Sequence, residues 1–202
     1  MYIDRENKVI FLHNPNCGGR FIRRCLSQRS DITSAYKYWG PYTRELNIDL
    51  SHINKYVLSR FVPDWKDYQV VVLIRNPYNR FMSAWNVARG NNKKIRRLGI
   101  EYNSPLSFLR CVDSLNYYEQ DCLLRSPEVP WFNPQSYYTD NEFLVLQYEN
   151  IEDWKLLFNL LGIENIGKIR IKPDYPFHSE MDNILRKLYF EDIEIFDKYQ
   201  KR

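Results

Sequence analysis

The stretch that decides the fold is KVIFLHNPNCGGRFIRRCL, at residues 8–26. It begins with the apolar, partly β-branched run 9–12, which predicts a buried strand in a sheet covered on both faces. The next residues cannot extend that strand, because Pro15 lacks an amide hydrogen and the pair Gly18-Gly19 permits backbone angles that other residues avoid. From about Gly19 the apolar residues recur four apart, which predicts an amphipathic helix.

The turn after this strand has the layout of an anion site. A strand, a glycine-bearing turn and a helix bring backbone amides and the positive end of a helix together. Arg20, Arg23 and Arg24 in the first turns of the helix favour a phosphate or sulfate ligand. An ordinary strand-to-helix turn of an α/β protein is the alternative. The stretch matches neither the Walker A pattern nor G-x-G-x-x-G.

Length and charge limit the classes of protein. The chain has 202 residues, which predicts one domain over residues 1–202 with a substantial core. Its net charge of +4 is too small to indicate a nucleic-acid partner, and it suits a small anionic ligand. No run of about 18 apolar residues is present, so we expect no membrane span.

The cysteines and histidines do not predict a metal site. Cys17, Cys25, Cys111 and Cys122 form no C-x-x-C pair, and the three histidines are scattered along the chain. We therefore expect reduced thiols, a reducing compartment and a cytoplasmic location, with no bound metal.

A second strand, turn and helix occur at residues 69–90. The run QVVVLI at 69–74 predicts a central parallel strand, Pro77 follows its end, and residues 78–89 have helical spacing. In a parallel sheet both turns lie at the carboxyl edge of their strands, where ligands bind. Arg75 and Ser83 can both donate hydrogen bonds to a phosphate at that edge, although an arginine in such a position is also a common surface ion-pair member.

His52 is a candidate general base. Ser51 predicts the cap of a short helix that carries His52 in its first turn. The positive end of a helix lowers the pKa of a histidine, which favours the neutral, basic form. A surface or core histidine without a catalytic role is the alternative.

The rest of the chain predicts further elements of an α/β protein. We expect strands at 143–146 and 168–172, and helices at 105–115, 151–161 and 180–199. The aromatic cluster 36–42, the basic loop 91–98 and Trp131 are candidates to shape an acceptor site; core packing and solvated surface are the alternatives.

Two stretches resemble the motifs of sulfotransferases that use 3′-phosphoadenosine-5′-phosphosulfate (PAPS). FLHNPNCGGRFI at 11–22 resembles their 5′-phosphosulfate loop, and LIRNPYNRFMSAW at 73–85 is similar to their 3′-phosphate motif R-[DN]-P-x-x-R-x-x-S-x-[WY]. Gln135, YENI at 148–151 and LYFEDIEIFDKY at 188–199 resemble further family landmarks in the right order. The resemblance covers most of the chain and is closest to the carbohydrate, heparan-type branch.

The resemblance implies an α/β fold with a central parallel sheet flanked by helices, P-loop-like at the first turn. It implies sulfuryl transfer from PAPS to a hydroxyl of a carbohydrate or small metabolite, with PAP as the other product and no metal. Arg75 and Ser83 would hold the 3′-phosphate, His52 would be the base and His13 would be mostly structural. The 5′-phosphosulfate would be held by Asn16, Cys17, Gly18, Gly19, Arg20 and Phe21.

One position departs from the family pattern. Asn16 stands where the family has a lysine that places positive charge on the bridging oxygen, and loss of one such donor costs about 10²–10³ in rate. Our hypothesis is that Arg20, or Arg23 one turn on, supplies the charge in part, so we count Asn16 and Arg20 with His52 as catalytic candidates. The alternatives are a catalytically silent module that binds PAP or another polyanion, and, with less support, a nucleotide kinase.

Overall fold

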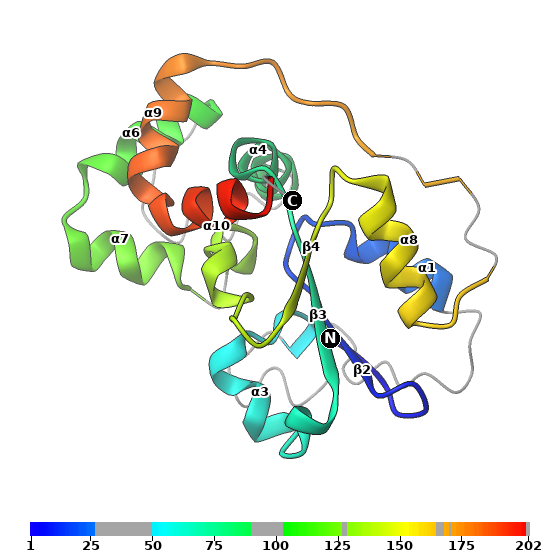
Figure 1. Ribbon diagram of the computed structural model, residues 1–202. Helices are drawn as coiled ribbons and strands as arrows, with labels where there is room; N and C mark the ends of the chain where they lie inside the picture. Colours follow the sequence, from blue (N-terminus) through cyan, green and yellow to red (C-terminus); the bar gives the residue numbers. More distant parts are fainter. Residues whose placement is uncertain (27–49, 90–102, 127–128, 165–167, 170, 201–202) are drawn as a thin grey trace. The chain divides into compact units, whose positions relative to one another are not determined.

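The computed structural model describes residues 1–26, 50–89, 103–126, 129–164, 168–169 and 171–200 (Figure 1). They form two compact units, the first from Met1–Arg75 and Gln135–Lys172, the second from Asn76–Pro134 and Pro173–Arg202. The aromatic cluster 36–42 and the basic loop 91–98 lie outside the described residues. The prediction of one domain over residues 1–202 stays a prediction.

The first unit contains a four-stranded sheet in the order β1-β2-β3-β4. Strands β2, β3 and β4 are parallel, and β1 pairs antiparallel with β2 at one edge. The strands are β1 (Tyr2–Asp4), β2 (Val9–Leu12), β3 (Gln69–Ile74) and β4 (Leu144–Gln147). The three parallel strands confirm the predicted ones, and together with the helices they confirm a mixed α/β fold. The expected strand at 168–172 is wrong for its described residues, which have no regular structure.

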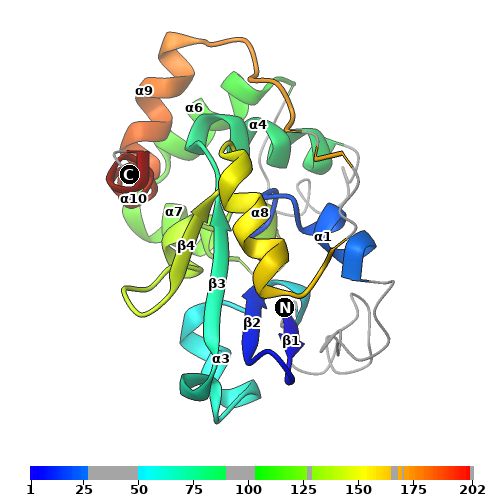
Figure 2. The same cartoon turned by 45° about the vertical axis from the view of Figure 1, so that its right-hand side comes forward.

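Two helices pack together against one face of this sheet, α1 (Gly19–Leu26) and α8 (Ile151–Leu160), as Figures 1 and 2 show. Their side chains share a core with alternate residues of the strands, such as Phe11 and Val71. Consecutive residues of β3 from Val70 onward are buried, as expected for a parallel strand covered on both faces. This packing holds the turn between β2 and α1 at the carboxyl edge of the sheet.

The first unit also contains α3 (Lys55–Phe61) and three short 3₁₀ turns. These turns are η1 (Leu50–His52), η2 (Trp65–Asp67) and η5 (Gln135–Tyr137). Asn54 caps α3, because its side chain accepts a hydrogen bond from the amide of Tyr56 at 3.1 Å.

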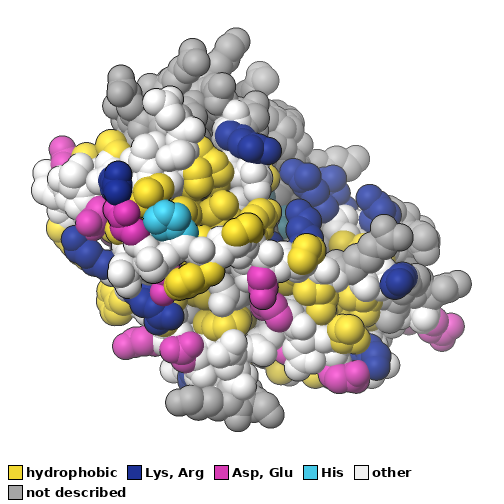
Figure 3. Space-filling view, turned by 90° about the horizontal axis from the view of Figure 1, so that it is seen from above, with side chains coloured by type: hydrophobic (Ala, Val, Ile, Leu, Met, Phe, Trp, Pro, Cys, Tyr) yellow, Lys and Arg dark blue, Asp and Glu magenta, His cyan; other side chains and the backbone are white. Residues whose placement is uncertain are grey.

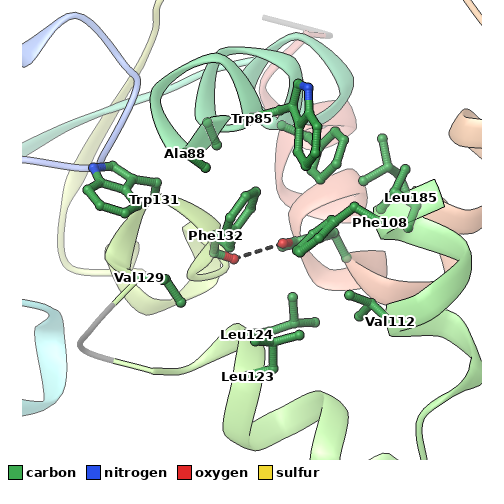
Figure 4. Packing of buried hydrophobic residues seen from close by; sticks show 14 of the residues in the cluster. Trp85, Ala88, Phe108, Val112, Leu123, Leu124, Val129, Trp131, Phe132 and Leu185 are labelled. Atoms are coloured by element: carbon green, nitrogen blue, oxygen red, sulfur yellow. Dashed lines mark hydrogen bonds between the residues drawn. The ribbon is translucent and has the colours of Figure 1, made fainter. Parts of the chain in front are cut away.

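The second unit is helical around an aromatic core. Its elements are α4 (Pro77–Ala88), α6 (Pro105–Ser114), α7 (Tyr117–Leu124), η4 (Pro130–Phe132), α9 (Ser179–Leu188) and α10 (Phe190–Gln200). The rings of Phe108 and Phe132 stack with centroids 4.9 Å apart, and Trp85 packs on Phe108 (Figure 4). Trp131 is buried in the same cluster, which favours packing over a role at an acceptor site.

The predicted helix 180–199 is wrong as one continuous element. It breaks at Tyr189, whose side chain is buried and whose hydroxyl donates to the carbonyl of Phe132 at 2.8 Å. That buried hydrogen bond pulls the residue between α9 and α10 into the core. Among the described residues, no helix has the length and apolar character needed to cross a bilayer.

Candidate functional site

The turn between β2 and α1 has an unusual backbone. Asn16 has a φ of 65° and Gly18 a φ of 86°, both in the left-handed region. Asparagine tolerates this conformation better than most residues, and glycine adopts it without strain. Within the described part of the chain, the amides of Gly18, Gly19 and Arg20 have no hydrogen-bond acceptor. These donors lie at the positive end of α1, where an anion is favoured.

Close packing explains why two glycines occur together. A Cβ atom on Gly18 would collide with the indole ring of Trp154, and one on Gly19 would collide with Nε2 of His13. Trp154 is buried, and its Nε1 donates to the carbonyl of Tyr148 at 2.7 Å, so its ring is fixed. The turn therefore depends on glycine for both conformation and space.

Gln135 joins the ends of β2 and β3. Its Oε1 accepts from the amide of Arg75 at 2.8 Å and from Nδ2 of Asn14 at 3.1 Å, and its Nε2 donates to the carbonyl of Arg75 at 2.8 Å. Asn14 also donates to the carbonyl of Leu73 at 3.0 Å. Gln135 is fully buried. Sequence reasoning named Gln135 only as a landmark and gave Asn14 no role, because a contact between residues so far apart in the chain has no local signal.

The side chain of Arg75 lies beside the turn. Only 2% of its surface is exposed, and its Nη1 donates to the carbonyl of Asn16 at 3.3 Å. The guanidinium lies over the ring of Tyr148 at 4.5 Å, and Nε is 3.9 Å from Oε1 of Glu149. Nε has no hydrogen-bond partner in the described part of the chain. The structure thus brings Arg75 and the glycine turn together within the first unit.

His52 lies next to His13, with ring centroids 4.5 Å apart. The expectation that Ser51 caps a helix is wrong, because His52 ends the turn η1 and α3 begins later, at Lys55. The predicted helix-end effect on His52 therefore has no structural basis. The pKa of His13 is well below its usual range, first because the ring is removed from water and then because His52, the N-terminus, Arg23 and Arg20 add positive charge.

The other predicted site residues, in the turn and just after it, differ in how far their side chains are exposed. The thiol of Cys17 is buried, with its sulfur 3.5 Å from Oε1 of Gln135, and the ring of Phe21 packs on Trp154. The side chain of Cys17 belongs to the core, whereas that of Phe21 is partly buried at its edge. Arg20 is exposed, and its charge reaches His13.

The stretch 73–85, which resembles the 3′-phosphate motif, lies mostly in the second unit, from Asn76 onward. Ser83 is on α4 and 7% exposed. Arg80 is buried, where its Nη2 donates to the carbonyl of Asn133 at 2.6 Å and Nη1 is 3.9 Å from the buried carboxylate of Asp192. Arg80 therefore stabilises the core of the second unit. The shared role of Arg75 and Ser83 on one phosphate stays a prediction.

Figure 3 shows basic, acidic and apolar side chains interspersed on the one face that it displays. Among the described residues, no group of three or more histidine, cysteine, aspartate or glutamate side chains is placed to hold a metal ion.

The open amides and the buried guanidinium of Arg75 at this strand-to-helix turn of a mixed α/β fold are hydrogen-bond donors of the kind that can bind an anion. The comparison with family models matches the Sulfotransferase family over residues 1–180, and the chain belongs to that family. It is thus a member of the transferases that move a sulfuryl group to a hydroxyl-bearing acceptor. Neither the curated proteins nor the solved structures gave a match.

Proposed function

We propose that this protein transfers the sulfuryl group of PAPS to a hydroxyl of a carbohydrate or small metabolite and releases PAP. The observation that supports the proposal is the set of open amides at Gly18, Gly19 and Arg20 beside the buried guanidinium of Arg75. Hydrogen-bond donors that are fixed before the ligand arrives stabilise developing negative charge without reorganisation.

The glycine turn would hold the 5′-phosphosulfate. The backbone of residues 16–21 and the side chain of Arg20 would donate to its oxygens, and Asn16 would add a neutral hydrogen bond. Arg75 and Ser83 would bind the 3′-phosphate, which distinguishes PAPS from ATP. An arginine suits this task because its planar fork matches phosphate oxygens.

His52 would act as the general base. The acceptor oxygen forms a bond to sulfur, the bond from sulfur to the bridging oxygen breaks, and that electron pair leaves on PAP. The acceptor proton moves to His52 during the attack. His52 is half-buried, so part of its surface is exposed. His13, whose lowered pKa keeps it neutral near pH 7, packs against it and adds no competing positive charge.

The test is sulfuryl transfer from PAPS to a panel of glycans and small alcohols, followed by mass spectrometry for the gain of one sulfuryl group. We expect His52→Ala to lower the transfer rate by roughly 10²–10⁴ and to leave PAP affinity nearly unchanged. His178→Ala, which removes an exposed histidine of the second unit, is the matched control. Loss of PAP binding in His52→Ala would instead indicate a structural role.

A catalytically silent module that binds PAP is the second candidate, and Asn16 is the observation that favours it. A neutral side chain at this position leaves the departing bridging oxygen without a charged donor from the turn. PAP binding without transfer to any acceptor in the panel would support this candidate over the enzyme.

A further inference from the structure

The glycine turn carries no positive side chain of its own. Residues 13–19 read HNPNCGG, without lysine or arginine. His13 is the one ionisable base among them, and its pKa is lowered well below the usual range, so it is neutral near pH 7. An anion bound by the amides of this turn therefore needs a cation from another part of the chain.

The exposed arginines of α1 are weak candidates. Arg20 and Arg23 both point to solvent, and in the described residues neither makes an ion pair or hydrogen bond that fixes its position. Water and salt screen exposed charges, so their attraction for an anion is small. Two long, unfixed side chains also lose rotamer entropy when they close on a ligand.

Arg75 meets the requirement better. It is nearly fully buried, where a charge interacts more strongly, and Nη1 already contacts the carbonyl of Asn16 in the turn. Gln135 holds both backbone groups of Arg75 and also binds Asn14 at the start of the turn. The guanidinium is thus fixed to the same scaffold as the open amides.

The guanidinium of Arg75 also has a hydrogen-bond donor that no described residue accepts from. Nε is buried without a hydrogen-bond partner in the described part of the chain, and the nearest carboxylate oxygen, on Glu149, is 3.9 Å away, too far for a hydrogen bond. A buried, incompletely paired cation is costly. An anionic oxygen that binds to Nε would lower that cost. An arginine whose donors are all paired would gain no such stabilisation from the ligand.

We propose that Arg75 serves the 5′ end of the nucleotide: its guanidinium binds an oxygen of the phosphosulfate held by the glycine turn and supplies the charge that Asn16 lacks. The inference rests on the proposed function and extends the role of Arg75 beyond the 3′-phosphate. Glu149 then acts as the counterion that holds the guanidinium when no nucleotide is bound.

Calorimetric titration with three ligands separates the two ends of the nucleotide. AMP carries only the 5′-phosphate, adenosine 3′-phosphate carries only the 3′-phosphate, and PAP carries both. We expect Arg75→Gln to weaken AMP binding by about tenfold to a hundredfold, because a charged hydrogen bond is lost. Arg60→Gln removes an exposed charge from α3 of the same unit and should leave AMP affinity unchanged.

The outcomes are distinct. If Arg75→Gln weakens adenosine 3′-phosphate and leaves AMP unchanged, the inference is overturned while the proposed function stands. If the wild-type protein binds neither AMP nor PAP, both are overturned. Should Arg75→Gln fail to fold, Glu149→Gln decides: removal of the nearby negative charge should tighten AMP binding severalfold, and an unchanged affinity would overturn the inference.

Discussion

The two strand-to-helix turns share a sequence pattern and differ in how they use their amides. The turn before α1 leaves the amides of Gly18 and Gly19 without acceptors among the described residues. The turn before α4 satisfies more of its own: the amide of Asn79 donates to the side chain of Asn76 at 3.1 Å, and that of Arg80 donates to the carbonyl of Asn76 at 2.8 Å. Pro77 has no amide hydrogen, and the amide of Tyr78 is left without an acceptor among the described residues.

This difference follows from the residues at each turn. Asn16 and Gly18 adopt left-handed angles and the turn leaves donors open, whereas Asn-Pro starts a helix in the standard way with a side-chain cap. The first turn can thus bind a ligand through its backbone. The second contributes mainly side chains, and the side chain of Arg75 reaches the first turn within its unit.

The largest expected effect tests whether Arg80 of the second turn is structural. Arg80→Met removes the buried guanidinium beside the carboxylate of Asp192, which is 1% exposed. We expect a loss of about 3–5 kcal/mol in the free energy of unfolding, measured with urea. A loss within about 1 kcal/mol would show that the pair does not stabilise the core.

Two variants control this experiment. Arg80→Met combined with Asp192→Leu removes both charges, so it should recover much of the lost stability. Arg110→Met breaks the exposed pair with Glu180, whose atoms are 2.6 Å apart, and should leave the unfolding midpoint close to that of the wild-type protein.

The next effect tests the glycine turn. Gly18→Ala places a Cβ against the ring of Trp154 at a φ of 86°, so overpacking adds to left-handed strain. We expect a loss of about 2–4 kcal/mol in stability, together with loss of AMP binding. Gly162→Ala, at a φ of 59° in the same unit, is the control for strain alone and should keep AMP affinity. Equal AMP affinity in both variants would contradict a ligand role for the turn.

Local patterns were enough to predict the three parallel strands and the helix that follows each of them. Continuous β-branched runs and spacing of four are properties of the segment itself. The strand β1 was missed because three residues carry too little pattern. The position of His52 was predicted wrongly, because Asn54 is a competing cap two residues further on. The hydrogen bonds of Gln135 to Asn14 and Arg75, and the break between α9 and α10 at Tyr189, depend on tertiary contacts. No local sequence pattern predicts such contacts.

A smaller effect concerns the histidine behind the glycine turn. The pKa of His13 in the folded state lies well below its ordinary value of 6.5. As the pH falls below that value, His13 takes up a proton in the unfolded chain before it does so in the folded protein. Stability from this group is therefore present above about pH 6.5 and is lost as the pH falls below it. The free energy of unfolding should therefore fall as the pH is lowered from about 6.5 toward the depressed pKa of His13 in the folded protein.

His13→Gln tests this linkage, since glutamine does not titrate. Unfolding measured with urea between about pH 5.5 and pH 7.5 should depend less on pH in the variant than in the wild-type protein, whatever its absolute stability. His178→Gln, at an exposed position, should leave the slope unchanged. Parallel curves for the wild-type protein and His13→Gln would rule out a depressed pKa at this position.

The smallest effect tests the cap of the second turn. Asn76→Ala removes the side-chain acceptor from the amide of Asn79, which costs about 1 kcal/mol in stability. Asn54→Ala removes the equivalent cap of α3 and should cost a similar amount. If the two turns differ as proposed, Asn76→Ala leaves the amide of Asn79, like that of Tyr78, without an acceptor among the described residues but does not change AMP affinity, because open amides without left-handed residues beside them form no anion site. Tighter AMP binding in Asn76→Ala would mean that capping alone separates the two turns, and that the glycine backbone of the first is not required.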